Sequence, residues 1–404
     1  LESIPEMVTM HIETASAATS TTIALNGFPP QTTHYKYQDT YRNQVIFITD
    51  SNGRYTYTQD LSKPHVVFIQ PRASTIFFYE YYWNVPVGTW DAATRTATLT
   101  QDVTESIEIW ADGITLDGNG HKVTGTGTGF GICFSTMVKP TRVTIKNLDI
   151  RQFSYGIAIW ESSSCTFANN SISNCEGGIV SQYSRGGDTI TGNSILGNNG
   201  AYGIAIWSGN NHIVTGNIVS NNNVGGGVGI SITSSSGSTL TGNTVSNNYY
   251  GMWLVSFNGG TISQNMVNSN SIGIVLSYSS TGNTLSSNAA NQNNYYGISL
   301  QSSSNNVLTS NTASSNGRII VDGYAGIYLG ASSNNAISNN MVSLNGGSGI
   351  YLNVGSNNNA LSTNTVISNY HGIHIRSSSH NTLTFNTAQS NSYYGIRLAR
   401  DSIN

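Results

Sequence analysis

The sequence reads Gly203-Ile204-Ala205-Ile206 at one point, Gly297-Ile298-Ser299-Leu300 at a second and Gly349-Ile350-Tyr351-Leu352 at a third. This short phrase is a glycine, an aliphatic residue, a variable residue and usually a second aliphatic residue. Because its apolar residues lie two apart, each copy predicts a β-strand with one buried face. The phrase occurs twelve times at intervals of 22 to 29 residues, with its glycines at Gly131, Gly156, Gly178, Gly203, Gly229, Gly251, Gly273, Gly297, Gly326, Gly349, Gly372 and Gly395.

A second phrase keeps step with the first. It is an asparagine followed two residues later by Ile, Val or Ala, and no stretch of the chain carries a sustained helical period. Stacked at inward turns, such amides would bond their neighbours above and below and satisfy buried turn backbone. The asparagines are Asn170, Asn193, Asn217, Asn243, Asn265, Asn288, Asn311, Asn340, Asn364 and Asn386.

A repeat length in the twenties with short alternating strands is typical of a solenoid. Three short strands per coil, each stacked on its copy in the next coil, fit the spacing. The sequence therefore predicts an all-β fold, a right-handed parallel β-helix of about 12 coils of 22–29 residues.

The run Ile114-Thr115-Leu116-Asp117-Gly118-Asn119-Gly120-His121, followed by coils of the Gly-Ile-x-Leu and Asn-x-Val type, resembles the NosD/CASH-type right-handed parallel β-helix repeat family. Archaeal cell-surface β-helix proteins are rich in the same pattern. The resemblance covers residues 96–404 and implies the fold. For function it implies a sugar-active enzyme, a binding module or an envelope structural protein, because one fold carries many functions.

Residues 1–95 differ in composition from the repeats. They hold six of the seven prolines and an aromatic cluster, Phe77-Phe78-Tyr79-Glu80-Tyr81-Tyr82-Trp83. We expect a β-rich N-terminal domain or cap over 1–95 and the β-helix over 96–404. The aromatic cluster is expected to pack on the first coil or, alternatively, to dock a partner.

Charge is scarce: 9% of residues are charged and the net charge is −3. This composition argues against a nucleic-acid partner, which needs a basic surface. No apolar run approaches the roughly 20 residues of a transmembrane helix, so no transmembrane segment is expected. The chain begins at Leu1, which suggests a processed product. Together with the polar composition, this predicts an extracellular or cell-surface location.

Few residues suit catalysis. From Thr189 to Gly317 the sequence has no Asp, Glu, Lys or Arg, so a carboxylate pair for acid–base chemistry is not expected in the middle coils. The weak catalytic candidates are Asp117, Asp149 and Arg151 in the first coils, where turn formation and ordinary surface charge are the competing interpretations. The sequence leans away from an enzyme, and no cofactor is predicted.

Two further sets of side chains suggest chemistry. His371, His374 and His380 are weak candidates for a metal site, without a carboxylate or thiol to complete it. Cys165 and Cys175 lie ten residues apart within one coil and are candidates for a disulfide. Cys133 is expected to point outward and to pair between molecules, and three free thiols are the alternative.

Aromatic residues gather beside the repeat glycines and at the outward position two residues after them. Rings on consecutive coils would lie about 4.8 Å apart along the axis. Such a column suits stacking on sugar rings, contact with a neighbouring protein, or simple stiffening of the solenoid. Its members include Tyr202, Tyr250, Tyr296, Tyr394, Trp253, Tyr328 and Tyr351.

The last repeat is followed by no recognisable cap, and natural solenoids protect their end strands. The sequence therefore predicts head-to-tail self-assembly into a cell-envelope layer, sheath or filament, with the protein itself as partner and cell-surface polysaccharide as a second one. Two alternatives stay open. One is a polysaccharide-binding module that uses the tyrosine column, and the other is a sugar lyase, epimerase or hydrolase that acts near the first coils.

Overall fold

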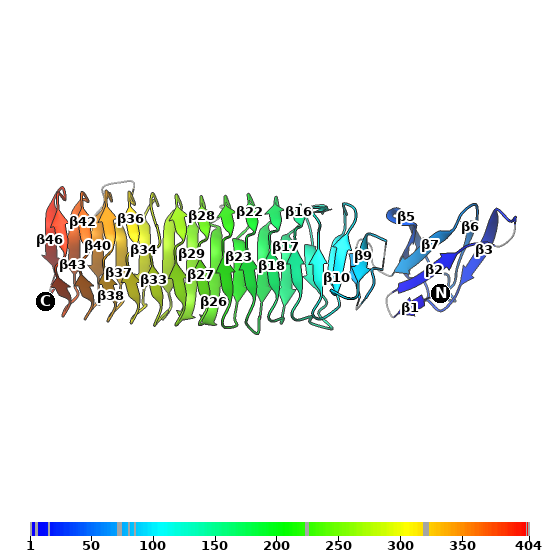
Figure 1. The fold of residues 1–404 in the computed structure, drawn as a ribbon, viewed down its shortest axis with the longest axis horizontal. Coiled ribbons are helices and arrows are strands. Elements are labelled where there is room, and N and C mark those ends of the chain that lie inside the picture. Colours follow the sequence, from blue (N-terminus) through cyan, green and yellow to red (C-terminus); the bar gives the residue numbers. More distant parts are fainter. Residues whose placement is uncertain are drawn as a thin grey trace.

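The computed structural model describes residues 2–4, 7–14, 17–70, 75–79, 81–84, 86–222, 226–317, 323–400 and 402. They form a small β-domain at the N-terminal end and a long solenoid of stacked coils (Figure 1). The all-β, right-handed parallel β-helix predicted from the repeats is confirmed. Among the described residues no helix is long and apolar enough to span a membrane.

The first sheet of the solenoid, here called the glycine sheet, contains the glycine phrases. It has 14 strands, and every adjacent pair is parallel. In order along the axis they are β8 (Thr75–Phe78), β11 (Ser106–Ile109), β14 (Phe130–Phe134), β17 (Tyr155–Trp160), β20 (Gly177–Gln182), β23 (Tyr202–Trp207), β26 (Val228–Ser236), β29 (Tyr250–Asn258), β32 (Ile272–Ser277), β34 (Tyr296–Gln301), β37 (Ala325–Gly330), β40 (Ser348–Asn353), β43 (His371–Arg376) and β46 (Tyr394–Ala399).

The second sheet, here called the threonine sheet, also has 14 strands, parallel except for the pairing of β9 with β10. Its strands are β9 (Gly88–Asp91), β10 (Thr96–Leu99), β12 (Thr115–Asp117), β15 (Thr144–Lys146), β18 (Thr166–Ala168), β21 (Thr189–Thr191), β24 (Ile213–Thr215), β27 (Thr239–Thr241), β30 (Thr261–Ser263), β33 (Thr284–Ser286), β35 (Val307–Thr309), β38 (Ala336–Ser338), β41 (Ala360–Ser362) and β44 (Thr382–Thr384).

The third sheet closes each coil and is interrupted once, where single bridges through Ala289 link its two parts. Its strands are β13 (Lys122–Thr124), β16 (Asp149–Arg151), β19 (Ser171–Ser173), β22 (Ser194–Leu196), β25 (Ile218–Ser220), β28 (Thr244–Ser246), β31 (Met266–Asn268), β36 (Thr312–Ser314), β39 (Met341–Ser343), β42 (Thr365–Ile367) and β45 (Thr387–Gln389).

The N-terminal domain is antiparallel. It contains a five-stranded sheet of order β1-β2-β7-β4-β5 and a two-stranded sheet formed by β3 and β6. The bounds are β1 (Glu2–Ile4), β2 (Met7–Ile12), β3 (Ser20–Leu25), β4 (Thr33–Gln38), β5 (Thr40–Ile48), β6 (Tyr55–Asp60) and β7 (His65–Gln70).

Strand β7 links this domain to the solenoid because its alternate side chains face two different cores. Val67 and Ile69 pack into the domain's own small core, whereas Phe68 packs into the long solenoid core. Tyr37 of β4 stacks on Phe68, with ring centroids 5.1 Å apart. The domain therefore caps the first coil. Since β8 and β9 belong to solenoid sheets, the solenoid reaches back to Thr75, before the division at residue 95.

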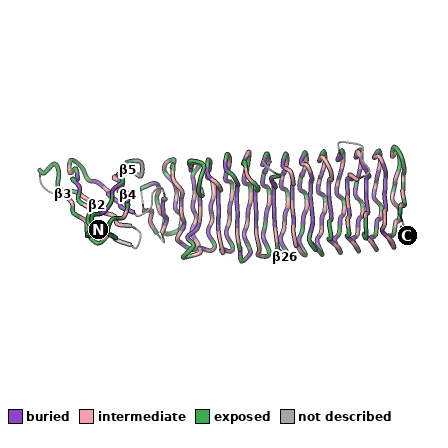
Figure 2. Tube along the Cα trace, turned by 180° about the vertical axis from the view of Figure 1, so that it is seen from behind, coloured by how far each residue is buried: buried purple, intermediate pink, exposed green. Residues whose placement is uncertain are grey.

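The core is one apolar column that runs the length of the solenoid (Figure 2). In β23, Ile204 and Ile206 point inward and are fully buried, as the two-residue alternation predicts. Each coil adds one such layer from each sheet, and the column ends in Tyr37 and Phe68 of the cap.

The asparagine phrase forms the ladder predicted from its spacing, at the corner between the threonine sheet and the third sheet. The backbone N–H and Nδ2 of Asn243 both donate to Oδ1 of Asn265, at 3.0 Å each. Nδ2 of Asn265 also donates to the carbonyl of Leu240, at 3.0 Å. Each amide thus satisfies buried backbone groups that have no strand partner.

Two more ladders were not predicted. One lies at the corner between the third sheet and the glycine sheet, formed by Asn198, Asn222, Asn248, Asn270, Asn293, Asn316, Asn345, Asn369 and Asn391. The other lies at the corner between the glycine and threonine sheets, formed by Asn283, Asn306, Asn335, Asn359 and Asn381.

The repeat glycines are required by close packing and not by a left-handed backbone. A Cβ atom on Gly251 would lie 2.8 Å from the carbonyl oxygen of Gly273 and 2.9 Å from Nδ2 of Asn270, and it would overlap Val267. The glycine phrase and the second ladder therefore depend on each other, because only glycine lets the strand approach the stacked amides.

We expect Gly251→Ala to lower the free energy of unfolding by about 1–3 kcal/mol, because the added methyl group overpacks a rigid corner. Chemical denaturation measures this as a lower transition midpoint. The matched control is Gly323→Ala, whose added Cβ meets nothing within 4 Å. Equal stability of the two variants would contradict the packing argument.

Candidate functional site

The outer surface of the glycine sheet carries a row of aromatic rings, here called the aromatic face. In β29, Tyr250 and Trp253 stack with ring centroids 5.1 Å apart and planes 20° apart. The indole Nε1 of Trp253 donates to Oγ of Ser277 on the next strand, at 3.1 Å. In β23, Tyr202 and Trp207 make an edge-on contact at 5.8 Å. Hydrogen bonds and ring contacts therefore hold these side chains in fixed orientations.

Toward the C-terminal end the rings form a continuous column. The ring of Tyr296 lies 4.7 Å from that of Tyr328, and the ring of Tyr328 lies 5.7 Å from that of Tyr351. The ring of Tyr351 stacks on His374 at 4.5 Å with planes 6° apart. Burial, together with the neighbouring Tyr328 and Tyr324, raises the pKa of Tyr296 to about 12. The phenol of Tyr296 therefore stays neutral at physiological pH.

The predicted members of the column differ in accessibility. Tyr202, Tyr250, Trp253, Tyr296 and Tyr328 are half-buried, so each offers part of a ring to solvent. Tyr394 is 45% exposed, whereas Tyr351 is only 2% exposed and supports its neighbours from below.

Small side chains between the rings make the face flat. Ala205, Ser231, Val275 and Ser299 occupy outward positions in the glycine sheet but are 2% exposed or less. Since an outward residue of a β-strand is normally open to water, the larger rings beside them must cover them. The face is thus an aromatic layer over small residues, and the glycine-sheet strands from β20 to β37 contain no Asp, Glu, Lys or Arg.

The weak catalytic candidates do not converge. Asp117 pairs with Lys146 at 3.1 Å, and Asp149 pairs with Arg151 of its own strand through hydrogen bonds of 2.8 and 2.6 Å. Partial burial acts to raise the pKa of Asp117, but hydrogen bonds from Asn147 and Asn119 and the charge of Lys146 outweigh it, so the pKa is lowered. Each candidate is held as a structural ion pair.

The histidine candidates are only partly brought together. His371 and His374 lie on β43 with ring centroids 5.4 Å apart and are buried. Nη1 of Arg397 lies 3.0 Å from Nε2 of His371, so a cationic group occupies that side of the pair. His380 lies in the turn before β44.

The predicted cysteine pair is wrong. Cys165 lies at the corner before the threonine sheet and Cys175 at the corner before the glycine sheet, each buried and each with a free thiol. Cys133 is half-buried and also free. Burial and the nearby Glu108 raise the pKa of the Cys133 thiol to about 12, so its reactive thiolate is scarce at neutral pH.

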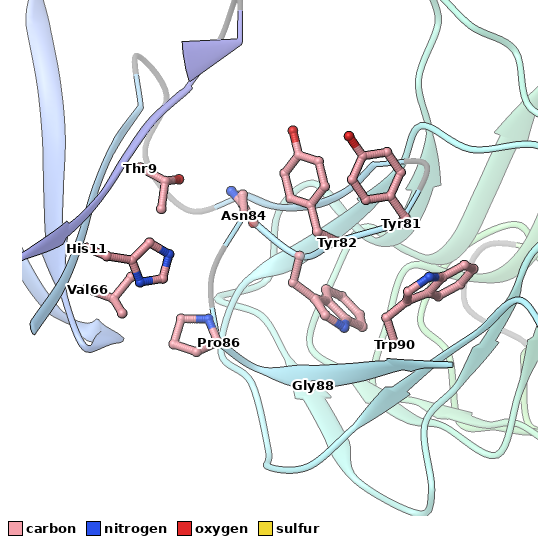
Figure 3. A pocket seen from close by; sticks show the side chains of 10 residues that line it. Thr9, His11, Val66, Tyr81, Tyr82, Asn84, Pro86, Gly88 and Trp90 are labelled. Atoms are coloured by element: carbon pink, nitrogen blue, oxygen red, sulfur yellow. The ribbon is translucent and has the colours of Figure 1, made fainter. Parts of the chain in front are cut away.

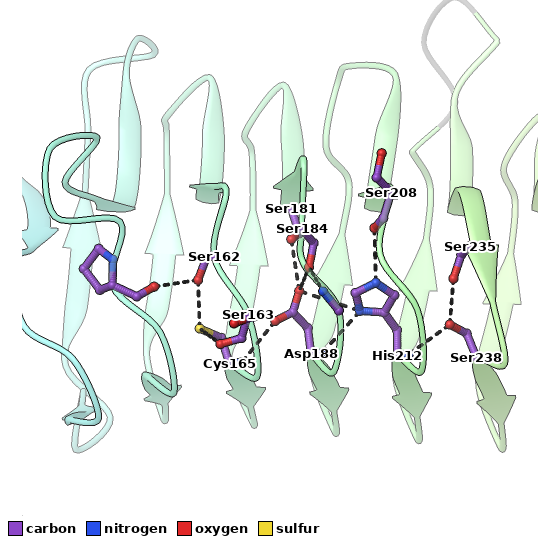
Figure 4. A network of polar contacts seen from close by, with 12 residues as sticks. Ser162, Ser163, Cys165, Ser181, Ser184, Asp188, Ser208, His212, Ser235 and Ser238 are labelled. Atoms are coloured by element: carbon purple, nitrogen blue, oxygen red, sulfur yellow. Dashed lines mark hydrogen bonds and ion pairs between the residues drawn. The ribbon is translucent and has the colours of Figure 1, made fainter.

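A buried polar stack lies at the same corner as the third ladder, farther toward the N-terminal end, with Gly260 between the stack and the ladder (Figure 4). The positions that hold asparagine in later coils hold Cys165, Asp188, His212 and Ser238 here. Asp188 is fully buried and accepts from the Cys165 N–H at 3.0 Å and from Ser184 Oγ at 2.7 Å. Nδ1 of His212 lies 3.7 Å from its carboxylate. The sequence could have revealed this stack, because each of the four residues directly precedes a strand of the threonine sheet.

Taken together, stacked parallel coils, inward amide ladders and an aromatic outer face define a right-handed parallel β-helix protein. The model of one family, described as the periplasmic copper-binding protein NosD, matches residues 95–256 and 226–321, more than half of the chain. A second model, described as the right handed beta helix region, matches residues 275–404. The chain belongs to the NosD/right-handed β-helix repeat family.

Solved structures share this fold at low identity. The periplasmic alginate epimerase AlgG superposes with a TM-score of 0.51 at 17% identity, over 78% of this chain and 79% of that chain. The Azotobacter vinelandii mannuronan C-5 epimerase AlgE4 A-module gives 0.45 at 13% identity, over 76% and 86%. The Dettilon tailspike protein gives 0.46 at 17% identity, over 75% and 61%. No curated protein matches the sequence.

The described residues offer no ligand set for the copper that the family description names. Within the described parts of the chain, no three His, Cys, Asp or Glu side chains gather closely enough to hold a metal ion. His371 and His374 supply two imidazoles, but the guanidinium of Arg397 lies against one of them and would repel a cation. These residues do not fit a copper centre.

The buried His212 predicts a pH dependence of stability. Burial lowers the pKa of His212 in the folded protein, although Asp188 opposes this. The unfolded chain, with a value near 6.5, then binds the proton more readily, so stability is retained above about pH 6.5 and falls below it. His212→Asn, which restores the ladder residue, should remove up to about 1.4 kcal/mol of this loss per pH unit. Chemical denaturation of both proteins at pH values from 7.5 to 5 measures this difference in the free energy of unfolding. Parallel pH profiles for the variant and the parent protein would contradict the prediction.

The three thiols should resist reagents in the folded protein. Burial raises the pKa of Cys165 to about 11, and it also raises that of Cys175. We expect no reaction with a thiol-specific chromophoric reagent until denaturant is added, when all three react. A disulfide-linked dimer on a non-reducing gel of the oxidised protein would show that Cys133 is accessible after all.

Proposed function

We propose that the protein is an extracytoplasmic polysaccharide-binding β-helix that holds an extended glycan along the aromatic face. The observation that carries this proposal is the row of half-buried rings on β23, β29, β34 and β37, from Tyr202 to Tyr328, which ring contacts hold in pairs. Tyrosine and tryptophan present an apolar ring with a polar edge, and a sugar offers the matching apolar face with hydroxyls around it.

The repeat favours a polymer as ligand. Coils follow one another at about 4.8 Å, and aromatic residues recur on every second coil from β23 through β29 to β34. A longer glycan therefore meets more rings. The absence of Asp, Glu, Lys and Arg from Thr189 to Gly317 favours an interaction by stacking and hydrogen bonding over one by ion pairing. The periplasmic alginate epimerase with the same fold has a polysaccharide as its named substrate, which supports this class of ligand and a location outside the cytoplasm.

We propose that the protein binds a glycan without cleaving it. Asp117 and Asp149 are neutralised by Lys146 and Arg151 in separate pairs, so neither is placed as the acid or base of a glycosidic reaction.

Self-assembly, the first expectation from the sequence, is the second candidate. In its favour, the inward positions of β46 are open: Ile396 is 52% and Leu398 57% exposed, while their equivalents Ile373 and Ile375 in β43 are fully buried. A coil stacked on β46, whether from a second copy or from further chain, would cover them. Sedimentation that rises with concentration and is abolished by Leu398→Glu would support this candidate, and a concentration-independent monomer would contradict it.

Calorimetric titration with glycan oligomers of increasing length tests the main proposal. We expect affinity to rise with length, and the double variant Tyr250→Ala/Trp253→Ala to bind at least about tenfold more weakly, as loss of a central aromatic contact usually costs more than 1 kcal/mol. The control is Phe385→Ala, which removes a 90% exposed ring at the corner between the threonine and third sheets. Unchanged affinity in the double variant would contradict the proposal.

A further inference from the structure

A second aromatic hollow lies where the N-terminal domain meets the first coils (Figure 3). It consists of two adjoining cavities of about 320 and 420 Å³ that share Tyr81 and Trp90. Their sizes fall at the lower end of the range for small-ligand sites, roughly 300–1,000 Å³. We call their union the junction groove. It lies at the opposite end of the solenoid from β46 and is separate from the rings of β23 to β37.

The walls of the groove are fixed before any ligand arrives. Trp83 and Trp90 both pack on the buried ring of Phe78, with centroids 5.1 and 5.2 Å away. Tyr82 stacks on Tyr79 at 5.4 Å, and Tyr81 packs on Tyr82 at 5.2 Å. Because these contacts set the ring orientations in the free protein, a ligand would not have to order them.

One ring is left open. Tyr81 is 62% exposed, although four other aromatic residues line the same groove: Tyr82, Trp83, Trp90 and Trp110. Tyr81 and Trp90 come from different segments of the chain (Figure 3), and both residues line each of the two cavities. Both rings are therefore within reach of one guest.

The polar rim of the groove is fixed by contacts within the protein. Arg95 donates to the carbonyls of Asp112 and Gly113 at 2.7 and 3.1 Å, which leaves its guanidinium at the edge of the larger cavity. The carboxylate of Asp112 accepts from the Thr141 N–H at 2.6 Å, and its other oxygen lies 3.8 Å from Nη2 of Arg142. Arg95 and Asp112 both line this cavity, so it offers hydrogen-bond donors and acceptors.

We infer that the junction groove is a second glycan site, which takes a neutral sugar ring between Tyr81 and Trp90. The ring faces match the apolar C–H face of the sugar, and Arg95 and Asp112 supply a donor and an acceptor for its hydroxyls. Both charged groups are already engaged within the protein, Arg95 by backbone carbonyls and Asp112 by Arg142, which favours hydrogen bonds to a neutral sugar over an ion pair with a polyanionic glycan. The inference rests on the proposed function only in taking a glycan as ligand, because its residues are different.

Titration calorimetry with five-residue neutral oligosaccharides of glucose, mannose, galactose and N-acetylglucosamine, and with pentamers of galacturonate and mannuronate, tests the inference. We expect at least one neutral pentamer to bind, and Tyr81→Ala and Arg95→Ala each to weaken it at least tenfold. Since Tyr81 is exposed, its variant should fold normally. Trp90→Ala is a further variant, used only if circular dichroism shows the native spectrum.

The comparison of variants separates the two proposals. Loss of binding in Tyr81→Ala with retention in Tyr250→Ala/Trp253→Ala supports the junction groove. The reverse pattern overturns the groove and leaves the aromatic face as the binding site. Binding of the uronate pentamers alone overturns the neutral-sugar assignment. Binding unaffected by either set of variants, or no binding of any oligomer, overturns both proposals.

Discussion

The structure depends on how the buried backbone at three corners of every coil is satisfied. At a corner the chain turns inward and its N–H and C=O groups leave the strand ladders, and an unpaired buried group costs about 1–3 kcal/mol. Stacked amides solve this problem because each one donates upward and accepts from below. Asn243 and Asn265 show the pattern, in which one Oδ1 accepts both a backbone and a side-chain N–H.

This arrangement explains much of the composition. Ladder amides need close contact with the following strand, which only glycine permits at positions such as Gly251. Stability then comes from inward isoleucine, leucine and valine and from neutral amides, so charged residues are not needed to hold the stack. The outer surface is left free to vary, and the glycine sheet uses that freedom for aromatic rings.

The sequence is most informative where a rule repeats and least informative where it is broken. The glycine phrase and Asn170 to Asn386 predicted the fold because the same contact recurs in each coil. The second ladder escaped notice since its asparagines lie just before the glycine phrase, in segments that read as ordinary turns. Asp188 and His212 were not predicted as ladder residues because their side chains differ from asparagine. Their equivalence to the ladder asparagines is seen only when the strands of successive coils are aligned.

Side-chain neighbours across coils were harder to predict than strands. Cys165 and Cys175 are close in sequence, yet they occupy different corners of one coil and cannot be paired by spacing alone. Tyr351 follows its glycine as Trp253 does, but it is covered by Tyr328 and His374. The boundary at residue 95 followed composition, whereas β8 enters the glycine sheet because Ile76 and Phe78 continue its inward alternation.

The most direct test of this account compares Asn198→Ala with Asn199→Ala. Asn198 is buried in the second ladder, where it accepts from the Cys175 N–H at 3.0 Å and donates to Asn222 at 3.1 Å, while Asn199 is exposed in the same turn. Chemical denaturation should show Asn198→Ala less stable by about 1–3 kcal/mol and Asn199→Ala within about 0.5 kcal/mol of the parent protein. Equal and small losses in both variants would show that the ladders do not hold the stack together.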